Sequence, residues 1–268
     1  MPNQKNPLFL NIAGFNIKIN FKSTEWEFAL KLKEKEINKF WKGFITIEPV
    51  KVDFTLNFVE RSYLEVIYKK KEKKQFMSFY EEKNSKEINT FYQVSIFQFQ
   101  VILRQIISRL LTNNGFILHG SASNIHGRAF LFTGDNGAGK STTMKLLKPY
   151  YPALADDTVI IRKENCEYYL YQTPFIEKEW WVKKNNQKLP LGKVYFLKKQ
   201  NFFKEEIIKE RGLIFEKIIK QFWTEEDEFM SKKTKLIYRF THSFNNFYYF
   251  YFAKNKRKLL DFIQKNEI

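Results

Sequence analysis

A glycine-rich segment has the residue types and spacing needed to hold a chain of phosphates. It fits the pattern G-x-x-x-x-G-K-[S/T] at each fixed position, with Gly134, Gly139, Lys140 and Ser141. Glycines let successive backbone N–H groups turn toward phosphate oxygens, and a following helix directs its positive end at the same anion. Lys140 would contact the outer phosphates, and Ser141 would offer its hydroxyl to Mg²⁺. We therefore predict an ATP-binding P-loop formed by Gly134, Asp135, Asn136, Gly137, Ala138, Gly139, Lys140, Ser141 and Thr142.

Two adjacent carboxylates, Asp156 and Asp157, follow Lys140 in the chain. They lie between the short helix expected after the loop and a strand expected from Thr158. A strand end beside a P-loop is where a metal ligand or a catalytic base can reach the γ-phosphate. A helix-to-strand turn also favours Asp for its local hydrogen bonds. Behind a P-loop we prefer the functional interpretation.

His119 ends the strand that precedes the P-loop strand in the sequence. If these two strands lie side by side, the imidazole approaches the phosphates, where it can accept a proton, bind metal or stabilise the transferred phosphate. A histidine packed at a strand end is the alternative. We count His119 with Asp156, Asp157 and Lys140 as a candidate catalytic residue, whereas His126 and His242 have no such placement.

Two common classes of P-loop protein need further motifs that this sequence lacks. The letters from Asn136 to Thr142 look like those of ABC-transporter ATPases. The chain has no Leu-Ser-Gly-Gly-Gln signature and no run of four apolar residues ending in Asp-Glu, and the Asn-Lys-x-Asp element of GTPases is also missing. These two classes are therefore not supported.

The segment from Leu118 to Arg162 resembles the HPr kinase/phosphorylase-like proteins, which are structurally akin to ATP-dependent phosphoenolpyruvate carboxykinase. The matching pieces are residues 118–120, 125–129, 132–142 and 154–159. Two later segments, 171–175 and 191–197, resemble the small HPr-kinase-like proteins of peptide-tailoring clusters, some of which phosphorylate a serine of a ribosomal peptide. The resemblance covers some 80 residues.

This resemblance implies that one Asp of the pair acts as base on a seryl hydroxyl, that Ser141 and a carboxylate hold Mg²⁺, and that His119 lies by the phosphate. It does not distinguish the two Asp residues, and we assign the metal to Ser141 and Asp157. The C-terminal signature of true HPr kinase is absent, and the N-terminal sheet does not look like that enzyme's N-terminal domain. HPr is therefore not the acceptor we expect, and the reverse phosphorylase reaction stays open.

We predict an ATP- and Mg²⁺-dependent kinase that transfers the γ-phosphate to a hydroxyl, in the first place serine, of a peptide or small protein. One alternative is a small-molecule kinase of the same fold, for which Arg128 and Arg162 are the nearby basic candidates. Another is a regulatory module that binds nucleotide without transferring phosphate. The acceptor, the preferred donor and the formation of a homo-oligomer are open.

The expected fold is α/β (α+β), with a mixed-sheet P-loop core like that of HPr kinase and phosphoenolpyruvate carboxykinase. A β-rich N-terminal domain over 1–90 should precede it, and its alternating strands have the spacing of an antiparallel sheet with one polar face. It is the natural module for acceptor recognition. The alternating segments are residues 15–21, 44–47, 52–58 and 63–68.

The nucleotide-binding domain should span 91–268. A helix is predicted from Tyr92 to Leu111 by apolar residues spaced three and four apart, with a stop at residues 113–115. Strands are expected at 116–119, 129–133, 158–161, 168–171 and 194–197, with a helix over 140–148. Beyond about residue 203 the chain should be mainly helical, including 213–222 and 255–265.

The composition places limits on partners and location. The formal charge of +17 comes almost entirely from scattered Lys, so we expect no nucleic-acid partner and interpret the run 69–74 as a solvated loop or strand edge. A single cysteine, Cys166, excludes an internal disulfide framework and a multi-Cys metal site. No signal peptide or spanning segment is recognisable, so we expect a soluble cytoplasmic protein. Trp180 and Trp181 are interpreted as a core or lid element.

Overall fold

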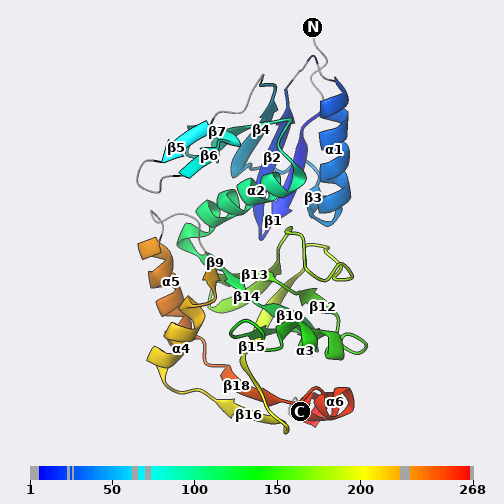
Figure 1. Ribbon diagram of the computed structural model, residues 1–268. Coiled ribbons are helices and arrows are strands. Elements are labelled where there is room, and N and C mark those ends of the chain that lie inside the picture. The colour runs from blue at the N-terminus through cyan, green and yellow to red at the C-terminus, as the bar shows by residue number, and fades with distance from the viewer. Residues whose placement is uncertain are drawn as a thin grey trace. The chain divides into compact units, whose positions relative to one another are not determined.

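The computed structural model describes residues 6–22, 25, 27–61, 66–69, 74–223 and 230–265. The chain forms two compact units, residues 1–110 and 111–268, and within the described residues it contains two mixed sheets and six α-helices (Figure 1). No helix among those residues is long and apolar enough to cross a membrane.

The N-terminal unit is built on a six-stranded sheet of order β3-β1-β2-β4-β8-β7. Its strands are β1 Leu8–Ile12, β2 Phe15–Phe21, β3 Ile45–Thr46, β4 Phe54–Val59, β7 Tyr80–Asn84 and β8 Glu87–Phe91. The strands β5 Val66–Lys69 and β6 Lys74–Met77 form a separate pair. The helices are α1 Glu27–Trp41 and α2 Ile96–Leu110, with a short 3₁₀ helix η1 at Lys42–Phe44.

The expectation of an antiparallel N-terminal sheet is wrong, because β2 pairs with β4 and β4 with β8 in parallel. A parallel pair needs a long crossover, and α1 supplies it between β2 and β4. We did not predict α1 because its apolar pattern is weak: its buried residues are Lys33, Ile37 and Trp41. Residues 62–65 and 70–73 lie outside the described residues, and with them half of the predicted strand 63–68 and most of the lysine run.

The helix predicted over 92–111 is confirmed as α2, and it packs in the N-terminal unit. Its Phe99 ring lies with its centroid 5.1 Å from that of Trp41 and 5.3 Å from that of Phe58. These aromatic contacts draw α2 onto the first sheet, so the chain passes from the first compact unit to the second after residue 110, whereas we predicted a boundary near residue 90. The roles assigned to the two domains stay a prediction.

The C-terminal unit contains a ten-stranded sheet in which β12-β10-β11-β15-β14-β13-β9-β17 are neighbours, while β18 pairs with β15 and β16. Its strands are β9 Gly115–His119, β10 Ser121–Ile125, β11 Arg128–Thr133, β12 Ala153–Ala155, β13 Thr158–Glu164, β14 Glu167–Gln172, β15 Lys188–Lys199, β16 Lys204–Ile207, β17 Phe222–Trp223 and β18 Phe247–Phe252. The helices are α3 Lys140–Leu147, α4 Arg211–Ile219, α5 Met230–Ser243 and α6 Lys256–Lys265, with a 3₁₀ helix η2 at Leu111–Asn113.

The long strand β15 joins the two halves of this sheet. Its first residues, Lys188–Pro190, pair antiparallel with β14, and its later part pairs in parallel with β11 and β18. Gly192 lies where the partners change, and a Cβ there would come within 2.7 Å of the Phe130 ring. The close approach of that ring therefore requires glycine at this position of the strand.

Both faces of this part of the sheet are buried, because successive residues of its strands enter different clusters. Val194 and Phe196 of β15 pack in a cluster with α4 and α5, whereas Tyr195 and Leu197 pack in a cluster with α3 and α6. Helices on both faces of a sheet are typical of the α/β class. The mixed α/β architecture that we predicted is therefore present in this unit.

The mainly helical C-terminus that we predicted is wrong in part. The helices α4 and α6 match predicted segments, but β16 and β18 are strands, and β18 lies beside β15. The sequence of β18, Phe-Tyr-Tyr-Phe-Tyr-Phe, is aromatic at every position. Such a run carries no visible period of two, so alternation could not reveal the strand.

Candidate active site

The glycine-rich loop connects β11, which ends at Thr133, to α3, which begins at Lys140. Gly134, Gly137 and Gly139 have φ values of 135°, 78° and 107°, a region that residues with a Cβ rarely adopt. Gly139 is constrained a second time, because a Cβ there would lie 2.4 Å from Cζ of Phe252. The ring of Phe252, in β18, thus packs against the loop at Gly139.

The ammonium group of Lys140 is buried against the loop from which it projects. Nζ donates hydrogen bonds to the backbone oxygens of Gly134, at 2.8 Å, and of Asp135, at 3.2 Å. Burial lowers the pKa of Lys140, and the carboxylates of Asp135, Asp157 and Asp156 oppose that shift. The Lys140 ammonium group is therefore held at the loop by two backbone carbonyl groups and by the nearby carboxylates.

Asp156 is a buried carboxylate, with 3% of its surface exposed. Its Oδ1 accepts a hydrogen bond from Ser121 Oγ at 3.1 Å, while Oδ2 is buried with no hydrogen-bond partner among the described residues. Burial raises the pKa of Asp156, and the hydroxyls of Ser141 and Ser121 act against the rise. A buried oxygen of this kind lacks the compensation that a cation could provide.

Asp157 is more accessible, with 44% of its side chain exposed, and it contacts the candidate histidine. Its Oδ1 lies 3.2 Å from Nδ1 of His119, and its Oδ2 accepts a hydrogen bond from Thr158 Oγ1 at 3.0 Å. The register of β9 and β13 places His119 opposite Thr158. The two Asp residues are thus adjacent in sequence but differ in environment.

The arrangement that we assumed for His119 is wrong, although the residue does line the site. Its strand β9 pairs with β13, whereas β11 lies between β15 and β10, and we did not predict β10. The polar sequence Ser-Ala-Ser-Asn-Ile of β10 carries no apolar run to mark a strand. His119 therefore lies next to Asp157 because its strand, β9, pairs with β13. It does not come from a strand that neighbours β11.

A single cavity of about 570 Å³ collects most of the predicted site residues. Gly134, Asp135 and Ala138 are the predicted loop residues that do not line it. The residues that line this cavity are His119, Asn136, Gly137, Gly139, Lys140, Ser141, Thr142, Lys145, Asp156, Asp157, Lys178, Glu179 and Lys199. Loop, carboxylate pair and histidine, separated by up to 38 residues in the sequence (157 − 119), therefore face one space.

Sequence reasoning missed the residues that come from the segment between β14 and β15. Glu179 pairs with Lys145 of α3 at 2.7 Å, and Lys178 lines the cavity. Nothing in the local pattern distinguishes these residues from other surface charges, so only the fold reveals them. The basic candidates for a small-molecule substrate, Arg128 and Arg162, do not line this cavity.

Trp180 is 90% exposed and is therefore not a core residue, while its interpretation as a lid element stays a prediction. Trp181 is part of the packing near α3. Its Nε1 donates a hydrogen bond to Glu179 Oε2 at 2.9 Å, and Lys148 Nζ lies 4.1 Å from the centroid of its ring.

The donor atoms fit a magnesium ion that takes most of its ligands from phosphates and water. No group of three or more His, Cys, Asp or Glu side chains that could hold a metal occurs in the described part of the chain. Mg²⁺ in phosphoryl-transfer sites commonly uses one or two protein oxygens and keeps several waters. Asp156 Oδ2 and the neighbouring Ser141 hydroxyl are two protein oxygens of this kind.

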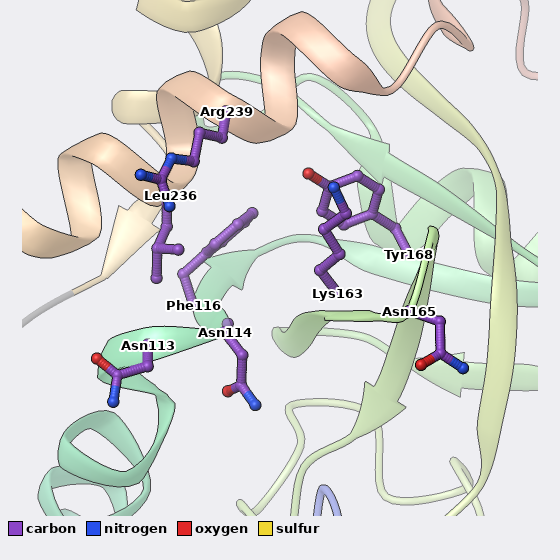
Figure 2. Close-up of a pocket in the computed structure, with 9 residues that line it drawn as sticks. Asn113, Asn114, Phe116, Lys163, Asn165, Tyr168, Leu236 and Arg239 are labelled. Carbon is purple, nitrogen blue, oxygen red and sulfur yellow. The ribbon is translucent and has the colours of Figure 1, made fainter.

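A second, smaller cavity of about 250 Å³ contains none of the predicted site residues. Figure 2 shows Leu236 and Arg239 reaching toward it from α5, with Phe116 and Tyr168 among its walls. It is lined by Asn113, Asn114, Gly115, Phe116, Lys163, Asn165, Tyr168, Leu236 and Arg239.

Comparison with known proteins gives a partial match. A family model described as "SynChlorMet cassette protein ScmC" matches residues 86–209, a little under half of the chain, and this segment includes all predicted site residues. Among solved structures, the Hpr(Ser) kinase/phosphatase from Coxiella burnetii is similar with 14% sequence identity and a TM-score of 0.32, over 56% of this chain and 94% of that one. No curated protein matches the sequence.

Proposed function

We propose that this protein transfers the γ-phosphate of ATP to a hydroxyl group, in the first place a serine of a peptide or small protein. The observation that carries the proposal is the shared cavity, in which Asp157 and His119 face the same space as Lys140 and Ser141. The ordered motifs that resemble HPr-kinase-like proteins support the same reaction class.

The different environments of the two Asp residues suggest a different role for each. Asp157 is accessible and is held by His119 and Thr158, so it is the better placed to take the proton of an incoming hydroxyl. Asp156 is buried, with one oxygen lacking a partner. We therefore propose Asp156, with Ser141, as the magnesium side of the site, in place of the Asp157 that we assigned from the sequence.

The proposed transfer is a direct displacement. The acceptor oxygen forms a bond to the γ-phosphorus while the bond from that phosphorus to the bridging oxygen breaks. The electron pair leaves with ADP, and the hydroxyl proton passes to the Asp157 carboxylate. Lys140 and the loop amides would stabilise the transferring phosphate by position and charge. Mg²⁺, when bound, would neutralise phosphate charge.

The acceptor would be recognised outside the cavity. The N-terminal sheet ends in the strands β3 and β7, and an extended peptide can add a strand to such an edge. We propose that unit as the recognition module for a peptide acceptor.

Mass spectrometry would test the proposal directly. Peptides encoded by neighbouring genes are incubated with the protein, ATP and Mg²⁺, beside a Lys140→Ala control. We expect one added phosphate group on a serine-containing peptide, absent in the control. Phosphorylation of a small hydroxyl compound instead would favour the small-molecule kinase. ATP binding measured by calorimetry, with no acceptor-dependent ADP release, would favour the regulatory module.

A further inference from the structure

Glu177 is a buried carboxylate that lies behind the candidate site. It belongs to the segment that connects β14 to β15, and 4% of its side chain is exposed. Glu177 does not line the candidate cavity, although its neighbours Lys178 and Glu179 do. Its surroundings must therefore account for a buried negative charge that the proposed phosphate transfer does not use.

One oxygen of Glu177 binds the backbone of both candidate aspartates. Its Oε2 accepts hydrogen bonds from the N–H of Asp156, at 2.8 Å, and from the N–H of Asp157, at 2.7 Å. These two residues lie between β12, which ends at Ala155, and β13, which begins at Thr158. The sheet ladder therefore does not hold these two N–H groups, and the carboxylate does.

The other oxygen of Glu177 forms an ion pair with Lys184 of the same segment. The Lys184 side chain is 15% exposed, and burial lowers its pKa while Glu177, Asp157 and Asp156 oppose that shift. A buried ion pair is costly to desolvate and very costly to break by removing one partner. Lys184 thus provides a countercharge for Glu177, which lies next to the two aspartates.

The side chain of Gln172, at the end of β14, binds the backbone of the segment that carries this ion pair. Gln172 Oε1 accepts hydrogen bonds from the backbone N–H groups of Asn185 and Gln187, each at 3.1 Å. Gln172 Nε2 donates to the backbone oxygens of Leu154 and Lys183, both at 2.8 Å. Gln172, the last residue of β14, therefore holds the part of the segment that contains Lys184.

We infer that Glu177, held by Lys184, is a positioning residue that fixes the backbone at Asp156–Asp157 and so aims both carboxylates at the phosphate loop. The inference rests on the proposed function for its catalytic consequence. The fixing of the two backbone amides is independent of that function. Glu177 touches no reacting group, so its effect should fall on kcat more than on the KM for ATP.

Three variants separate hydrogen bonding from charge. Glu177→Ala removes the acceptor and leaves Lys184 unpaired. Lys184→Met leaves the carboxylate unpaired. The double variant Glu177→Gln/Lys184→Met keeps an acceptor oxygen for the two amides and removes both charges. Glu216→Ala is the control, because it deletes a carboxylate from an exposed ion pair of α4.

The experiment measures amide hydrogen exchange at residues 156 and 157, together with kcat, KM for ATP and the thermal midpoint. For Glu177→Ala we expect exchange faster by about tenfold or more and kcat lower by about 10- to 100-fold, the range for lost hydrogen bonds to a charged group. KM for ATP should stay within about threefold. The double variant should recover most of both losses, and Glu216→Ala should change neither.

Unchanged exchange in Glu177→Ala overturns the inference. So does a folded double variant that exchanges as fast as Glu177→Ala, because it still has the acceptor oxygen. If Glu177→Ala does not fold, the double variant against wild type decides by the same measure. A wild-type protein that transfers no phosphate refutes the proposed function alone, since hydrogen exchange still tests how the two amides are held.

Discussion

The candidate-site cavity and the second cavity described above lie at opposite ends of the same pair of strands. β9 and β13 run antiparallel, with His119 opposite Thr158 at one end and Gly115 opposite Arg162 at the other. His119 lines the candidate site, and Gly115 lines the second cavity. Four residues of strand, about 13 Å, separate these two positions.

The two ends of this strand pair differ in whether their charged side chains are buried or exposed. The candidate site buries the charged residues Lys140 and Asp156, which is costly unless something compensates. The second cavity has its cations, Lys163 and Arg239, exposed at the surface, over the buried rings of Phe116 and Tyr168. The shared strands therefore do not explain the difference. The glycine-rich loop and α3, which follow β11, are present at one end only.

The sharpest test of this comparison removes one lysine from each end. Lys140→Ala should lower the rate of phosphate transfer on the order of 10³-fold, since it deletes a preorganised cation from the phosphate site. Lys163→Ala, in the second cavity, should change the rate by less than about twofold. The rate of acceptor-dependent ADP release measures both. Equal losses would mean that the catalytic centre has been placed at the wrong end of the strands.

Asp157→Asn should have the next largest effect. Removing a general base typically costs about 10²- to 10⁴-fold in kcat. ATP affinity should change by less than about threefold, because the proposed role of Asp157 is toward the acceptor hydroxyl. Steady-state kinase assays measure kcat, and calorimetry measures the affinity for ATP. Normal transfer by this variant would rule out Asp157 as the base.

Gly139→Ala should lower the free energy of unfolding by about 1–3 kcal/mol. The new Cβ would collide with the Phe252 ring, and residue 139 has a positive φ. Gly212→Ala is a matched control at the start of α4, where a Cβ would have nothing within 4 Å, and it should be neutral or stabilising by up to about 1 kcal/mol. Urea unfolding followed by circular dichroism measures both. A stable Gly139→Ala protein would show that β18 does not constrain the loop.

The smallest expected effect of a substitution on activity concerns the metal requirement. Chelation by EDTA should stop transfer, and excess Mg²⁺ should restore it. Asp156→Asn should raise the Mg²⁺ concentration needed for half-maximal activity by about tenfold or more, whereas Asp157→Asn should leave that concentration nearly unchanged. The reverse pattern would return the metal to Asp157, as assigned from the sequence.

Several parts of the fold were predictable because their signals are local. The helix α2 has apolar residues three and four apart, and the predicted strands of the β13–β14 hairpin are confirmed as an antiparallel pair. The predicted strand before the glycine-rich loop and the helix after it are also present. Each of these depends on residues close together in the chain, so periodicity and turn residues suffice.

The sequence by itself thus determined which segment has the glycine-rich P-loop pattern, between a strand and a helix, and which polar residues follow it. The tertiary structure alone decided that β10 lies between β11 and β12, that His119 enters beside Asp157 through β13, and that Glu177 lies beneath both aspartates. The contacts of His119 and Glu177 join residues 20 or more positions apart. They arise from sheet order and burial, for which a linear pattern has no signal.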